Sequence, residues 1–124
     1  MGGSTTMGTF TVRIEVAALS GDRFITTDAL VDTGATYTLL PRKILRDLGV
    51  HPIDRIPFQL ADERQTEYDI GEVRIRLDGH QRVAVVVFGD DDTAPLIGAT
   101  TLELFSLAVD PIKRRLVPAP ALLK

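Results

Sequence analysis

The sequence predicts an all-β domain whose sheet closes into a barrel-like shape and carries one or two short helices. Three observations lead to this prediction. Apolar and polar residues alternate with a period of two in several short runs, turn-forming residues separate these runs, and only two brief segments have helical features. With 124 residues, the chain is long enough for one domain with its own core and too short for two of ordinary size.

The first strands are expected near the N-terminus. Between residues 10 and 16, apolar residues hold the even positions and polar residues the odd ones, which predicts a strand with one buried face. Ser20-Gly21-Asp22 is a turn signal. Residues 24–31 are again extended and lead into Asp32-Thr33-Gly34-Ala35, where glycine permits a sharp change of backbone direction.

A short helix and a projecting hairpin are expected next. Residues 41–48 are typical of a helix, since Pro41 suits a first helical position, Ile44, Leu45 and Leu48 share a face, and Gly49 can end it. Residues 58–60 and 67–70 are extended and flank a polar tip at residues 62–65. This arrangement predicts a projecting hairpin rather than a core element.

The second half of the chain repeats the strand pattern. Residues 73–77 alternate, Asp78-Gly79 is a strong turn signal, and the apolar run 83–88 predicts a strand buried on both faces. Thr100 and Glu103 have the spacing of a capping box, which predicts a second short helix carrying Leu102 and Phe105. Residues 107–117 return to strand.

The segment that indicates function is Leu30-Val31-Asp32-Thr33-Gly34-Ala35. An Asp-Thr-Gly triplet alone is weak evidence, because it arises by chance in roughly a few per cent of chains of this length. Here two apolar residues precede the aspartate, so a buried strand would position its carboxylate. A second run of two apolar residues and a glycine, Leu96-Ile97-Gly98, stands before the second expected helix.

With this layout the sequence resembles the retropepsin-like aspartic proteases over residues 9–117. The resemblance implies the acid-protease fold, a flap hairpin, and a homodimer in which the terminal strands interleave. It also implies that Asp32 is the catalytic carboxylate, that Thr33 bonds the opposing loop across the dimer, and that Gly34 lets the substrate approach. The substrate-binding residues expected from it are Leu30, Ala35, Leu39, Ala61, Asp62, Pro95 and Leu96.

Elementary chemistry also argues for a dimer. Peptide hydrolysis by this route needs one carboxyl group to take a proton from water and another to give one to the carbonyl oxygen. Two carboxyl groups about 3 Å apart share a proton and supply both functions. The chain contains one such triplet, so we expect Asp32 from each of two subunits to form the dyad, with water as the nucleophile and no cofactor.

Two departures from the retroviral pattern affect these expectations. Retroviral flap tips are rich in glycine, whereas residues 61–64 here contain none, so either a stiffer closure or more polar contacts to the peptide are expected. Retroviral enzymes also pair an acidic residue after the Asp-Thr-Gly-Ala stretch with an arginine after the later glycine. Thr36 and Ala99 stand at these positions, which avoids a lone buried charge but removes one expected support of the dimer.

Other interpretations compete with the catalytic one. Asp32 could be a turn aspartate that bonds its own loop, and the whole domain could be an inactive dimerisation or peptide-binding module. Residues 90–92 are three adjacent aspartates, for which a solvated loop is favoured over calcium binding, so no metal is predicted. His51 and His80 stand beside turn sequences and are expected at the surface.

The resemblance implies a peptide or protein substrate and a second copy of the chain as partners, and composition argues against other classes of partner. A net charge of -3 without a long basic run argues against nucleic acid. No apolar stretch approaches the roughly 18 residues needed to span a bilayer, so no membrane contact is predicted. The absence of cysteine is compatible with the cytoplasm, which is favoured without being required. Residues 1–8 are expected to be a leader or expression remnant, and residues 118–124 a tail that could join the dimer interface.

Overall fold

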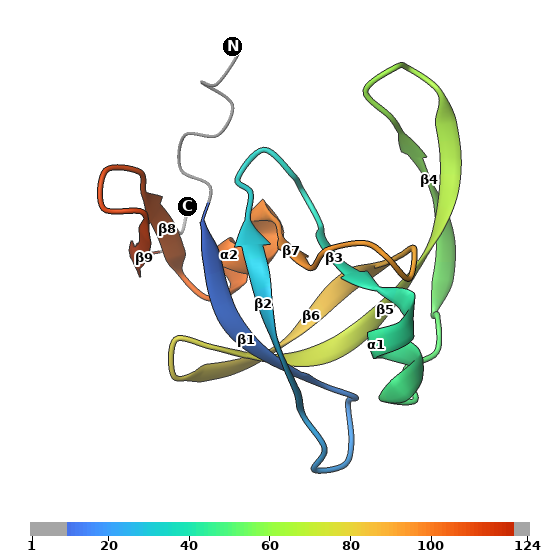
Figure 1. Ribbon diagram of the computed structural model, residues 1–124, viewed down its shortest axis with the longest axis horizontal. Helices are drawn as coiled ribbons and strands as arrows, with labels where there is room; N and C mark the ends of the chain where they lie inside the picture. The colour runs from blue at the N-terminus through green and yellow to red at the C-terminus, as the bar shows by residue number, and fades with distance from the viewer. Residues whose placement is uncertain (1–9, 121–124) are drawn as a thin grey trace.

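Six strands close into a barrel in the computed structural model, which describes residues 10–120. The sheet order is β1-β2-β7-β3-β6-β5-β4. An additional pairing between β1 and β5 closes the sheet into the barrel, and β4 lies outside it (Figure 1). The all-β prediction is therefore confirmed. The expected leader and residues 121–124 of the tail lie outside the described residues. The bounds are β1 Thr11–Ala17, β2 Ile25–Val31, β3 Thr38–Pro41, α1 Arg42–Asp47, β4 Asp54–Gln59, β5 Gln65–Leu77, β6 His80–Gly89, β7 Leu96–Ile97, α2 Ala99–Leu104, β8 Leu107–Asp110 and β9 Arg115–Pro118.

The core fills the barrel with branched aliphatic side chains from every barrel strand. Alternation in β1 is confirmed up to Val16, because Ile14 and Val16 are fully buried while Arg13 is exposed and Glu15 partly exposed; Ala17 at the strand end is buried as well. Such side chains suit a pleated surface with one buried face. The largest fully buried apolar side chains are Ile14, Val16, Val31, Leu40, Leu45, Val73, Ile75, Val86 and Ile97.

Strand β5 belongs to both the projecting hairpin and the barrel. Its first six residues pair with β4 to form the hairpin that projects from the barrel, and residues 70–77 pair with β6 (Figure 1). The two extended segments expected at 67–70 and 73–77 are thus one continuous strand of 13 residues. The turn expected at Asp78-Gly79 is confirmed, since both residues have positive φ and connect directly paired Leu77 and His80.

Contrary to the prediction from the sequence, strand β6 is not buried on both faces along the whole apolar run 83–88. Val83 and Val85 are 51% and 37% exposed, so the expectation of burial on both faces is wrong for the first half of the run. Burial becomes continuous from Val86 to Gly89, where β6 pairs with β3; at Val86 and Val87 it also pairs with β5. An apolar run in the sequence does not show at which residue a second neighbouring strand begins to cover it.

Both helices form, but each begins differently from its prediction. Pro41 is the N-cap of α1 and the last residue of β3, a strand that the pattern does not predict. The N-cap of α2 is Gly98, and no side chain caps this helix, so the expected Thr100/Glu103 capping box is wrong. Among residues 10–120, no helix is long and apolar enough to cross a membrane.

The segment 107–117 is a hairpin rather than one strand. Strands β8 and β9 pair with each other in a separate two-stranded sheet, on the side of the barrel away from the β4–β5 hairpin (Figure 1). The Asp110 carboxylate accepts hydrogen bonds from the backbone N–H groups of Ile112 and Lys113, at 3.1 and 3.2 Å, and so stabilises the turn.

Candidate active site

Asp32 directly follows β2, but the expectation of a buried strand holds for only one face of it, because Ala29 and Val31 are buried while Leu30 is 36% exposed. Val31, the last residue of β2, is buried and pairs in parallel with Ile97 of β7. The Asp32 N–H continues this ladder by donating to the carbonyl oxygen of Ile97, at 3.0 Å. The aspartate itself is half-buried, so its backbone is fixed while its carboxylate remains accessible.

The loop after Asp32 folds back on the carboxylate. The Gly34 N–H donates to Asp32 Oδ1 at 2.9 Å, and the Ala35 N–H donates to the Asp32 carbonyl oxygen at 3.2 Å. Within residues 10–120, Asp32 Oδ2 has no hydrogen-bond partner. The turn interpretation of Asp32 is therefore correct for one carboxylate oxygen and leaves the other available. Thr33 is exposed, and its bond across a dimer stays a prediction.

The first residues of α2 hold this loop in place through hydrogen bonds. The N–H groups of Ala99 and Thr100 donate to the carbonyl oxygens of Ala35 and Thr36, at 2.7 and 3.0 Å. The Thr100 hydroxyl donates to the same Thr36 oxygen at 2.8 Å. These bonds satisfy two helix-end N–H groups without a side-chain cap. They also show how the loop is held within one subunit although Thr36 and Ala99 lack the charges of the retroviral pair.

A buried hydroxyl pair completes the support. The Thr38 and Thr101 hydroxyl oxygens lie 2.5 Å apart, and the Gly98 N–H donates to Thr38 Oγ1 at 3.1 Å. Both threonines are at most 2% exposed. Gly98 is in close contact with the loop, because a Cβ atom there would lie 2.4 Å from the carbonyl oxygen of Tyr37. The apolar-apolar-glycine run thus has a steric reason for its glycine.

A cleft of about 390 Å³ lies between this loop and the β4–β5 hairpin. Of the residues expected to bind substrate, Ala35, Leu39 and Leu96 line it. Leu30 and Pro95 do not line this cleft, although a backbone bond of 2.9 Å joins them beside β7. Ala61 and Asp62 are exposed at the hairpin tip and do not line it either. A second depression, of about 540 Å³, is lined by polar residues of β1 and the β5–β6 turn and includes no residue of the Asp32 loop.

Aromatic side chains that sequence reasoning missed connect the two walls of the cleft. Tyr37 contacts Phe58 of β4 edge to face, with ring centroids 5.5 Å apart, and Phe58 contacts Tyr68 of β5 at 5.8 Å. All three line the cleft. Tyr37 follows the Asp32 loop in the chain, so these contacts join the loop to the hairpin. The sequence feature that could have identified them is the position of Phe58 and Tyr68 within the two strands of the expected hairpin.

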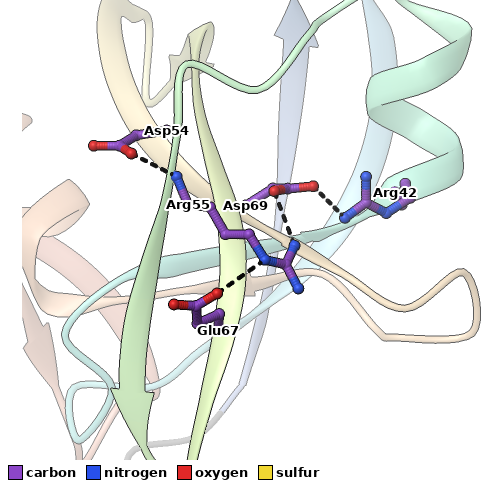
Figure 2. A network of polar contacts seen from close by, with 5 residues as sticks. All are labelled: Arg42, Asp54, Arg55, Glu67 and Asp69. Atoms are coloured by element: carbon purple, nitrogen blue, oxygen red, sulfur yellow. Dashed lines mark hydrogen bonds and ion pairs between the residues drawn. The ribbon is translucent and has the colours of Figure 1, made fainter.

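Charged groups fasten the base of the hairpin to α1 (Figure 2). Arg42 donates to Asp69 Oδ2 at 2.8 Å, and Arg55 donates to Asp69 Oδ1 at 3.0 Å. Arg55 also lies 3.4 Å from Glu67 Oε1. The hydrogen bond from Arg42 is the main cause that lowers the pKa of Asp69 below its ordinary value of 3.8; partial burial opposes it, and Arg55 adds to it.

Comparison with solved structures places this geometry among retroviral-type proteases. The EIAV protease superposes with a TM-score of 0.57 at 16% identity, covering 78% of this chain and 88% of that chain. The simian foamy virus protease gives 0.58 at 18% identity, covering 77% and 94%. The retroviral protease-like domain of Ddi1 from Leishmania major gives 0.53 at 15% identity, covering 87% of each chain.

Sequence comparisons agree with the structural ones at the level of the family. No curated protein gives a significant sequence match. A family model described as aspartyl protease matches residues 10–101, which include the Asp32 loop, the hairpin and the Leu96-Ile97-Gly98 run. The family model covers most of the chain, so this chain belongs to the aspartyl protease family, and its fold is that of the retroviral proteases.

Proposed function

We propose that this protein is an aspartic endopeptidase that acts as a homodimer. The observation that carries the proposal is the fixed Asp32 loop. Its carboxylate keeps one oxygen without a bond within the described residues, and its residues Ala35 and Thr36 line a cleft bounded by the hairpin, although Asp32 itself does not line that cleft. The chain has a single Asp-Thr-Gly triplet, so a second carboxyl group must come from another copy.

The proposed chemistry uses the Asp32 pair as a coupled acid and base. One carboxylate takes a proton from a water molecule, the water oxygen attacks the peptide carbonyl carbon, and the other carboxyl group gives its proton to the carbonyl oxygen. Collapse of the tetrahedral intermediate breaks the C–N bond, with proton transfer to the leaving amine. No metal or cofactor enters this sequence. Because this mechanism needs one protonated and one deprotonated carboxyl group, it predicts a bell-shaped dependence of kcat/KM on pH.

The β4–β5 hairpin is the proposed flap. Its aromatic contact to Tyr37 and its Asp69–Arg42 ion pair to α1 support a defined resting position, from which it would cover a bound peptide and exclude water from the dyad. At its tip, Arg64 pairs with Asp62, and the Glu63 N–H bonds to the Leu60 carbonyl oxygen. These internal bonds take the place of the glycine-rich tip of retroviral flaps.

The decisive experiment compares the wild type with Asp32→Asn on a mixed peptide library between mildly acidic and neutral pH. Loss of one member of a catalytic unit should reduce kcat/KM by at least about 10³-fold. Circular dichroism and sedimentation of the variant serve as the control for folding and assembly. Equal cleavage by both proteins would refute the proposal. Peptide binding without cleavage by the wild type would identify an inactive peptide-binding module instead.

A further inference from the structure

The cleft beside the Asp32 loop combines an apolar wall with one formal charge. Its wall includes the rings of Tyr37, Phe58 and Tyr68 together with aliphatic side chains of β3, β6 and β7. Among the described residues that line it, Asp90 alone carries a formal charge. An unpaired carboxylate beside an apolar surface discriminates between ligands. An apolar ligand that covers the carboxylate leaves it without a partner, and an acidic ligand is repelled by its charge.

Asp90 is fixed in position but not paired. Its carbonyl oxygen accepts a hydrogen bond from the Thr93 N–H at 3.0 Å, which closes a turn directly after β6. Within residues 10–120 its carboxylate has no ion pair or hydrogen bond. The next residue differs, because Asp91 pairs with Arg46 at 3.4 Å and does not line the cleft.

A long basic side chain complements both features at once. The aliphatic part of arginine or lysine can pack against the aromatic wall while its charged end reaches the Asp90 carboxylate and solvent. A guanidinium group gains further attraction from the face of a tyrosine or phenylalanine ring. A neutral aliphatic side chain of similar length would make the first contact but not the second.

We infer that this cleft selects peptides with an arginine or lysine side chain at one position near the cleaved bond, and that Asp90 is the residue that determines this selectivity. The inference rests on the proposed peptidase function, since it names the substrate class of the same site. Because Asp90 is exposed, water and salt screen the ion pair. We therefore expect a preference of about threefold to tenfold in kcat/KM over norleucine, smaller in high salt.

The test uses a positional set of eight-residue peptides in which one position at a time carries arginine, lysine, norleucine, glutamine or glutamate. Cleavage by the wild type should favour arginine and lysine at one position, and Asp90→Asn should reduce this preference over norleucine to the part that the aromatic rings alone supply. Asp91→Asn is the matched control, because it removes the same charge from the same loop outside the cleft. It should keep the preference.

Two results would overturn the inference: a wild type without preference for basic residues at any position, or an Asp90→Asn variant that retains the full preference. A binding arm separates this inference from the proposed function. Anisotropy titrations of the same peptides with Asp32→Asn protein should show the basic preference without cleavage. Preference in binding together with no cleavage by the wild type would refute the peptidase and leave the role of Asp90 standing.

Discussion

Gly98 lies where any side chain would collide with the Asp32 loop. A Cβ atom would approach the Tyr37 carbonyl oxygen to 2.4 Å, and this oxygen belongs to backbone that cannot rotate away. Gly98→Ala should therefore displace the loop, lower the free energy of unfolding by about 1–3 kcal/mol and reduce kcat. Chemical denaturation and peptide cleavage measure the two effects.

Gly21→Ala provides a control of similar stability. Gly21 has a φ of 98° in the β1–β2 turn, and a Cβ atom there would meet no other part of the protein within 4 Å. Alanine at this position therefore costs backbone strain of about 1 kcal/mol away from the Asp32 loop. It should lower stability and leave kcat unchanged. A Gly98→Ala variant with normal kcat would show that the loop tolerates the shift.

At the scale of elements, the Asp69 network makes hairpin anchoring dependent on pH. The pKa of Asp69 is lowered in the folded protein, so its contribution to stability is complete above the unfolded value and is lost as pH falls through the folded one. Asp69→Asn should reduce stability at pH 7 by about 1 kcal/mol. The difference from wild type should decrease as the pH falls below 3.8 and vanish below the folded pKa, as measured by urea unfolding across pH.

A control variant and one possible outcome test this prediction. Glu67→Gln removes a more exposed charge on the same strand, which lies 3.4 Å from Arg55, and should change stability much less. A stability difference between wild type and Asp69→Asn that persists unchanged at low pH would contradict an electrostatic origin and point to packing.

Elements defined by local pattern are predictable from the sequence, and those defined by distant partners are not. Alternation locates β1, and the apolar pair before Asp32 predicts the end of β2, where Asp32 lies, although only one face of that strand is buried. Strand β3 has only four residues and exists because β6 and β7 flank it, a pairing that no local pattern records. The contact of Tyr37 with Phe58 likewise depends on how far the hairpin leans toward the barrel.

The candidate site shows the same division. Ala35, Leu39 and Leu96 are expected in the cleft and line it, because they belong to segments next to the two diagnostic glycine runs. The sequence predicts a solvated loop at Asp90, which its exposure supports, but its position beside the cleft follows only from the turn after β6.

For the whole molecule, the proposed dyad makes activity depend on assembly. Specific activity should fall when the protein is diluted through the dissociation constant of the dimer, as measured by peptide cleavage alongside analytical ultracentrifugation. Adding an equal amount of Asp32→Asn protein should reduce wild-type activity to roughly half, because random exchange places half of the wild-type chains in mixed dimers. Activity that is independent of concentration and unaffected by the variant would exclude a shared site.

One continuous strand, β5, belongs both to the barrel and to the hairpin, and its partner changes from β4 to β6 at Ile70. Gly71 follows, packed so closely that a Cβ atom would lie 2.8 Å from the Phe88 ring. The hairpin thus has no separate linker on this side. Any swing over a bound peptide must be taken up as twist along β5, and amide exchange should therefore rise stepwise from the barrel half toward the tip, with the step at Gly71.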